Sequence, residues 1–376
     1  MSAMLAMHMS NELLSLPMAA GTMVLAAVVV GVAAWRARAS LDPATLPLMG
    51  VMGAFVFAAQ MLNFPIGFGI SGHFGGTVLL AVLLGPWAAI LTMTSILIVQ
   101  CLLFADGGLL ALGCNILNIG VVPALLGGGL YNLVRGASSS PRRLYMAAWL
   151  GATVGVLSGA ALVPLQVTAS GVLLIPLHAF LPVILGAHVA IGLAEGAITF
   201  AVLAYLQRTR PQLFHRSQGQ IVGATIPAAD DATYGAVGGE AAGADHRPGQ
   251  AAVLTSLLGT ALLLAGAGVW FASTADDGLE ASLDPERYNV AAVIHNDHSA
   301  IARADAIQAA IAPLPDYTKP DAASDDEPAG WLNVSGWSSL AGLLGTIVTL
   351  GLVRAVAQLL KRRDQVTSQR VNQSTS

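Results

Sequence analysis

Residues 76–104 have the sequence GTVLLAVLLGPWAAILTMTSILIVQCLLF, which contains no acidic or basic side chain. A helix needs about 20 apolar residues to cross the hydrocarbon core of a bilayer, so this stretch is longer than one crossing requires. The pair Gly85-Pro86 interrupts it, and both residue types break helices. We therefore expect two membrane helices here, the first of them short, at about residues 76–84. A short span is tolerated where it is buried in protein or lines a cavity.

The rest of the chain has the same apolar character. Of its 376 residues 55% are hydrophobic and only 10% are charged, and the mean hydropathy is +0.70, whereas a soluble domain carries about 25% charged residues. Further apolar runs occupy residues 17–35, 45–61, 109–134, 144–165, 171–206, 251–271 and 337–356. The composition predicts an all-α, polytopic membrane protein, in which many of the 41 glycines allow close helix packing.

Basic residues follow four of the apolar runs and indicate which ends are cytoplasmic. They are Arg36 and Arg38, Arg135, Arg142 and Arg143, Arg208, Arg210 and Arg216, and Lys361, Arg362 and Arg363. We therefore expect a multi-pass protein of the inner (plasma) membrane, with its N-terminus outside and its C-terminus in the cytoplasm. Between the outer loop 62–74 and Arg135 the chain must then cross an odd number of times. Three crossings, with a second break at residues 106–108, give seven membrane helices up to Leu206 and two more beyond it.

A long polar stretch divides the chain into parts. Residues 1–206 form the first transmembrane unit, and residues 207–250, rich in Gly and Ala, are expected to be a cytoplasmic linker. Residues 251–356 carry two spans around an extracytoplasmic segment with far more acids than bases, and residues 357–376 form a polar cytoplasmic tail.

The sequence Met7-His8 has the chemistry of a metal chelate if Met7 is the first residue. Its free amine and the His8 amide nitrogen would close a five-membered ring on an ion, and the same amide and the His8 Nδ1 a six-membered ring. His73, in GISGHFGG on the same side of the membrane, could supply a fourth nitrogen. Planar nitrogen coordination suits Ni(II) and Cu(II) better than Zn(II). The alternative is that His8 is a frayed terminal residue and His73 an ordinary loop histidine at the membrane interface.

Three stretches resemble a known family. They are MHMSNELLSLPMAAGT (residues 7–22), SGHFGGTVLLAVLLGPWAAILTMTSILIVQCLLFADGGLLALGCNILNIGVV (residues 71–122) and ADDGLE (residues 275–280). The first two resemble the cobalt/nickel substrate-binding (S) components of energy-coupling-factor ABC transporters, the CbiM/NikM family, over about residues 7–206. The third resembles the PDGLE motif of the small partner subunit of these systems, with Asp276 where proline is expected.

This resemblance implies that the ion is held by the Met7 amine, by His8 through backbone and side chain, and by His73. Six residues precede Met7 and would turn that amine into an amide, so we expect translation to start at Met7. The resemblance also implies Ni(II) or Co(II) as transported substrate, a transmembrane coupling (T) subunit and two cytoplasmic ATPases as partners, membrane lipid around the helices and no nucleic-acid partner.

Two further sets of residues are assigned supporting roles. Asp106, Asn115 and Asn118 are expected to form hydrogen bonds that hold the loops over the site. Gly50, Ala54 and Ala58 place small side chains on one helical face, which suits either packing inside the bundle or docking of the coupling subunit.

The sequence leaves the role of other ionisable residues open. His188 and Glu195 share a helical face with each other and, like His178, lie in an apolar run, where they serve either substrate passage or helix pairing. His295 and His298 are more typical of a solvated loop than of a metal site. The C-terminal spans are expected to act in coupling or metal loading rather than to form the binding site.

The sequence excludes an ATPase site, because neither of the two lysines follows a glycine-rich turn: Lys319 precedes Pro320 and Lys361 precedes Arg362. We therefore expect no enzyme activity in this chain. An intramembrane metalloprotease is the first alternative, but its His-Glu-x-x-His motif is missing from the sequence. A metal-sensing receptor is the second, although the linker and tail offer no output domain. Planar coordination favours nickel over cobalt without deciding between them.

Overall fold

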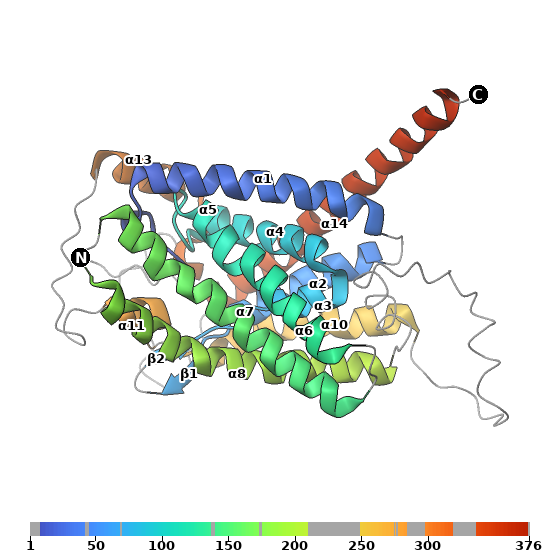
Figure 1. The fold of residues 1–376 in the computed structure, drawn as a ribbon, viewed down its shortest axis with the longest axis horizontal. Helices are drawn as coiled ribbons and strands as arrows, with labels where there is room; N and C mark the ends of the chain where they lie inside the picture. The colour runs from blue at the N-terminus through green and yellow to red at the C-terminus, as the bar shows by residue number, and fades with distance from the viewer. Residues whose placement is uncertain are drawn as a thin grey trace.

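The computed structural model describes residues 8–41, 45–67, 70–136, 140–172, 175–209, 249–273, 275, 277–283, 298–318 and 336–374. These residues are mostly helical, as the sequence predicts, and the helices form an elongated bundle (Figure 1). The first unit contains α1 (Leu16–Ser40), α2 (Thr45–Gln60), α3 (Thr77–Leu84), α4 (Pro86–Phe104), α5 (Leu112–Asn115), α6 (Gly128–Arg135), α7 (Pro141–Ser170) and α8 (Leu177–Thr209). The second contains α10 (Gln250–Gly266), α11 (Gly278–Leu283), α13 (His298–Ile311) and α14 (Gly336–Ser374).

Six of the described helical stretches are long and apolar enough to cross a membrane, and the two shorter apolar helices are α2 and α10. The six are Leu16–Arg38, Pro86–Phe104, Leu112–Arg135, Pro141–Ser170, Leu177–Thr209 and Gly336–Arg362. The stretch Leu112–Arg135 is one continuous helix whose middle, Ile116–Val121 and Pro123–Gly127, winds as π-helix. The total of nine crossings and the orientation of the termini stay predictions.

The apolar stretch at residues 76–104 folds as two helices, as expected. The short α3 ends at Leu84, and α4 begins at Pro86, which needs no N–H in the first turn of a helix. Gly85 between them has a φ of +82°, a backbone conformation that glycine adopts without steric cost. Every residue of α3 is buried, which satisfies the condition for a short apolar helix at membrane depth.

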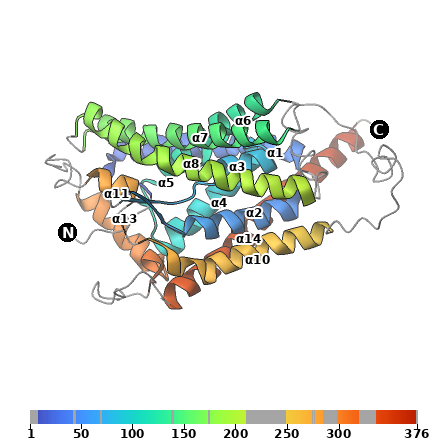
Figure 2. The same ribbon diagram turned by 90° about the horizontal axis from the view of Figure 1, so that it is seen from below.

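The two units pack side by side. Helices α7 and α8 lie along one side of the bundle, and α10 and α14 lie along the opposite side, against α2 (Figure 2). The small elements gather at one end: the hairpin of β1 (Phe64–Gly67) and β2 (Ile70–Gly72), then α11 and α13 (Figures 1 and 2). The N-terminal arm that precedes α1 reaches the same end, where Met9, Leu13 and Leu14 join a separate apolar core.

The face of α2 that suits either bundle packing or docking of a coupling subunit is covered by other helices of this chain. Ala54 and Ala58 are fully buried, and a Cβ added to Gly50 would lie 3.3 Å from the Leu350 side chain of α14. Packing inside the bundle therefore accounts for these small residues, and another subunit would have to displace α14 to reach them. Docking of a subunit there stays untested, but the described structure leaves no open surface for it.

Candidate metal centre

The N-terminal arm is fixed against the loop that follows α4. The amide of Met9 donates to Asn115 Oδ1 over 3.0 Å, and the Met9 carbonyl accepts from Asn115 Nδ2 at 3.2 Å and from the amide of Gly108 at 2.9 Å. Asn11 Oδ1 accepts a further hydrogen bond, 2.7 Å long, from the amide of Leu110. The arm is therefore not frayed from His8 onward: one backbone hydrogen bond and three that involve asparagine side chains hold it.

This pairing buries His8 beside a carboxylate. His8 is 2% exposed, and its Nδ1 lies 2.7 Å from Asp106 Oδ1. Within the described part of the chain its other ring nitrogen, Nε2, is buried and has no hydrogen-bond partner. Gly107, with a φ of +80°, passes so close that an added Cβ would lie 2.8 Å from the His8 Cβ, so only glycine fits this turn.

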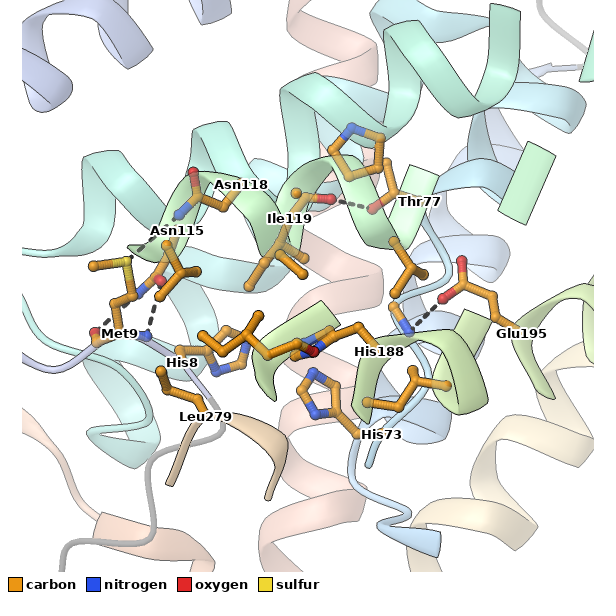
Figure 3. A pocket seen from close by; sticks show the side chains of 18 residues that line it. His8, Met9, His73, Thr77, Asn115, Asn118, Ile119, His188, Glu195 and Leu279 are labelled. Carbon is orange, nitrogen blue, oxygen red and sulfur yellow. Dashed lines mark hydrogen bonds between the residues drawn. The ribbon is translucent and has the colours of Figure 1, made fainter. Parts of the chain in front are cut away.

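His73 approaches His8 from the turn between β2 and α3. The centroids of the two imidazole rings are 5.7 Å apart, and the ring planes are inclined by 46°. Both rings face a cavity of about 100 Å³, which is also lined by His188 and, at its far end, Glu195 (Figure 3). The two histidines that the sequence singled out thus meet at one cavity, whereas Met7 lies outside the described residues.

The geometry at His8 differs from the chelate expected from the sequence. That chelate uses Nδ1, but in the structure Nδ1 faces Asp106, and Nε2 is the nitrogen left for a further partner. A histidine that binds a metal through one nitrogen and donates from the other to a carboxylate is a common arrangement, because the carboxylate fixes the ring and its tautomer. Among the described residues, no three His, Cys, Asp or Glu side chains form a set that could hold an ion.

The surroundings of the two imidazoles shift their pKa values in opposite directions. Burial disfavours the charged form of His8, but the adjacent Asp106 carboxylate outweighs it and raises the pKa of His8 above its usual value. Burial, assisted by the charge of His8, lowers the pKa of His73 to about 3. Burial would raise the pKa of Asp106, yet His8 and a hydrogen bond from Tyr317 together lower it. His73 is therefore neutral at ordinary pH, as a metal ligand must be.

The two asparagines lie where a supporting role requires them. Asn115 binds both polar backbone groups of Met9, and Asn118 exchanges two hydrogen bonds of 2.8 Å with Gln166 of α7. Asn118 Nδ2 also lies 3.5 Å from the Met9 sulfur. The π-helical winding starts between these asparagines, at Ile116, a feature often found at functional sites.

The segment between the two C-terminal spans contacts the candidate site, although every proposed ligand lies in the first unit. Tyr317 donates to Asp106 Oδ2 over 2.6 Å, and Gln308 Nε2 donates to the Gly107 carbonyl over 2.7 Å. Leu279 of α11 lines the cavity, and Asp305 accepts a hydrogen bond from Asn11. Leu279 belongs to the PDGLE-like stretch 275–280, whereas Asp305, Gln308 and Tyr317 lie further along the acidic segment, where no motif or spacing indicated their positions.

Two other histidines with described surroundings, His178 and His188, differ in whether they reach the cavity. His188 lines the cavity, with its Nδ1 bound to the Ile184 carbonyl at 2.8 Å. His178 is exposed in the first turn of α8. His295 lies outside the described residues, and His298 is the first residue of α13. His188 and Glu195 do not pair with each other, because Glu195 binds backbone amides instead.

Comparison with known proteins identifies two matching families. Residues 8–213 match the family CbiM, described as the cobalt uptake substrate-specific transmembrane region, and residues 251–362 match the PDGLE domain. A protein of Haloquadratum walsbyi named for metal transport is 38% identical over 55% of this chain and 93% of its own length. The fused nickel transport protein NikMN of Rhodobacter capsulatus is 36% identical over 45% of this chain and 52% of its own. The cobalt transport protein CbiM of Sorangium cellulosum is 32% identical over 56% and 96%.

Proposed function

Because the chain belongs to the CbiM family of metal transport proteins, with a PDGLE domain fused behind that region, we propose that it captures Ni(II) or Co(II) outside the membrane as the substrate-binding component of an energy-coupling-factor transporter. The protein is a membrane-embedded metal uptake protein, and its family and relatives are transporters rather than enzymes. The role in substrate capture, the ligands of the ion and the partner subunits are what we propose.

The convergence of His8 and His73 carries this proposal. They come from separate segments, their ring centroids are 5.7 Å apart, and both face one cavity. His8 Nε2 is buried with no partner among the described residues, and the pKa of His73 keeps that ring neutral. Leaving a buried polar nitrogen unpaired costs free energy, which a bound cation would offset. The ion is held by both imidazoles, and the Met7 amine supplies a third donor.

Energy for transport comes from other chains. The sequence has no phosphate-binding loop. In this proposal two cytoplasmic ATPases hydrolyse ATP, and a transmembrane coupling subunit links them to this chain. Of the two ions we favour Ni(II), because planar nitrogen coordination suits Ni(II). The fused relative from Rhodobacter capsulatus is named for nickel transport, which supports this choice.

The test of this function is the His73→Ala variant. Cells that carry the chain with its coupling and ATPase subunits are given radioactive nickel or cobalt, and the purified proteins are titrated with the same ions. Loss of one ligand should weaken binding by several kcal/mol, on the order of a hundredfold or more. His178→Ala is the matched control, since His178 is exposed on α8. Uptake and affinity at the unsubstituted level in a correctly inserted His73→Ala protein would refute the proposed function.

A further inference from the structure

The turn that carries His73 lies directly against one face of α8. A Cβ added to Gly72 would lie 2.4 Å from the Ile191 side chain, and one added to Gly75 would lie 2.8 Å from Glu195 Oε2. Ile191 and Glu195 are four residues apart and so share one side of their helix. The glycines on either side of His73 thus allow its backbone to touch α8.

Glu195 binds this turn through both carboxylate oxygens. It is 1% exposed, its Oε2 accepts a hydrogen bond from the amide of Gly75 at 3.0 Å, and its Oε1 accepts one from the amide of Gly76 at 3.2 Å. Helix α3 starts at Thr77, and Gly76 at its N-cap has no side chain to satisfy the first amides. The carboxylate from α8 therefore binds the two amides that precede the first residue of α3, close to the helix N-terminus, whose partial positive charge favours an anion.

The same peptide unit is held from the opposite side. Gln60 Nε2 of α2 donates to the Gly75 carbonyl over 2.9 Å, and Gln100 Nε2 of α4 donates to Gln60 Oε1 over 3.0 Å. Both polar groups of Gly75 are thereby fixed, the amide by α8 and the carbonyl by α2. Since Gly75 is two residues from His73, this arrangement restricts where the imidazole can stand.

We propose that Glu195 is a positioning residue for His73: it clamps the turn at Gly75 and Gly76 so that the imidazole faces His8. The effect of Glu195 on ion binding rests on the proposed function, because a misplaced His73 would bind the ion less well. Glu195 is not itself a ligand, since each of its oxygens is engaged by a backbone amide. It also does not form an ion pair with His188 on its own helix.

The test compares Glu195→Gln and Glu195→Ala with the control Thr199→Val. Thr199 lies one turn further along α8, is equally buried and has no hydrogen-bond partner for its hydroxyl among the described residues. Hydrogen–deuterium exchange of the peptide that covers residues 70–78, in metal-free protein, reports the clamp itself. Removal of a charged acceptor should speed exchange there by about tenfold or more, and Thr199→Val should leave it unchanged.

A second readout reports the consequence at the metal. Cu(II) is added as a paramagnetic probe, and nitrogen splittings are measured by electron paramagnetic resonance. The Glu195→Ala spectrum should shift toward that of His73→Ala, and its Cu(II) dissociation constant should rise by roughly tenfold. Gly75→Ala places a methyl group against Glu195. It should change the Cu(II) spectrum and raise the Cu(II) dissociation constant in the same way.

The exchange and Cu(II) measurements test separately whether Glu195 holds the turn and whether the chain binds metal. Unchanged hydrogen–deuterium exchange at residues 70–78 in Glu195→Ala and in Gly75→Ala would overturn the proposal, regardless of the result for Cu(II) binding. Faster exchange with unchanged Cu(II) spectra would overturn the claim that the clamp positions His73. Failure of the unsubstituted protein to bind any ion would count against the proposed function instead, and the exchange arm would still decide whether Glu195 holds the turn.

Discussion

Tyr317 donates its phenolic hydrogen to Asp106 over 2.6 Å, and so joins the C-terminal unit to the carboxylate that fixes His8. The tyrosine ring also stacks on Phe104 at the end of α4, with the ring centroids 4.6 Å apart. Asp106 thus uses one oxygen for each unit of the chain. The PDGLE-containing unit is therefore structurally part of the candidate metal centre, and several tests follow from this contact.

Tyr317→Phe should weaken nickel binding by a few-fold to about tenfold without loss of folding. The substitution keeps the stacked ring and removes only the hydrogen bond to a charged group, which is worth roughly 1.5–3 kcal/mol at most. Isothermal titration of the purified protein measures the effect. Tyr205→Phe, which alters an exposed hydroxyl bound to Ser256, is the control and should have no effect. Equal affinities in both variants would show that Tyr317 does not support the site.

Asp106→Ala decides which nitrogen of His8 binds the ion. If Nε2 is the ligand and Asp106 supports the ring through Nδ1, affinity should fall by about tenfold to a hundredfold. If the ion is chelated through Nδ1, the carboxylate competes with it, and its removal should leave affinity unchanged or raise it. We expect the fall, because Nδ1 and Asp106 Oδ1 are 2.7 Å apart and Nε2 is the unpaired nitrogen among the described residues.

Metal affinity should fall in acid because His8 takes up a proton. The Asp106 carboxylate raises the pKa of His8, so protons compete with the ion from a higher pH than for an ordinary histidine. His73, with a pKa of about 3, stays neutral over the same range and adds nothing to the loss. Below the His8 pKa the dissociation constant should therefore rise by about tenfold per pH unit. In Asp106→Asn the fall should begin at a lower pH; a profile identical to that of the unsubstituted protein would contradict this assignment.

A protein truncated after Arg210 should still bind metal, with reduced affinity. His8, Asp106 and His73 all precede the truncation, but Tyr317, Gln308 and Leu279 are lost with the second unit. The newly exposed face of α2 is apolar and can contact lipid, so insertion should persist. Equilibrium binding in detergent and transport in cells measure the two effects. Complete loss of binding by a correctly inserted truncated protein would mean that the second unit supplies an indispensable ligand.

A protein produced with Met7 as its first residue should bind nickel more tightly than one with residues 1–6 ahead of it. A free amine donates to the ion more readily than a peptide nitrogen, which must first lose its proton. Intact mass confirms the start of each protein, and titration compares their affinities. Equal affinities would exclude the Met7 amine as a ligand, and the two histidines would then need other donors.

The sequence by itself determined the helical, membrane-embedded character of the chain and indicated the two histidines of the candidate site. Long apolar runs satisfy their backbone hydrogen bonds in lipid by forming helices, so α4, α7 and α8 followed from composition. Gly85-Pro86 ended α3 for a local reason, the conformational preferences of two residues. His8 and His73 were identified by their neighbours in sequence, and the structure brings them together at one cavity.

Only the tertiary structure decided what surrounds those histidines. The partner of a buried polar group depends on which segments pack against it, and this cannot be obtained from spacing along one chain. Glu195 thus binds the amides of Gly75 and Gly76 rather than a histidine on its own helix. In the same way α14 covers Gly50, for which docking of another subunit was one of two alternatives, and Tyr317 reaches Asp106 from far along the chain. Local composition fixes which segments are helical, whereas the packing of those segments determines which polar groups meet.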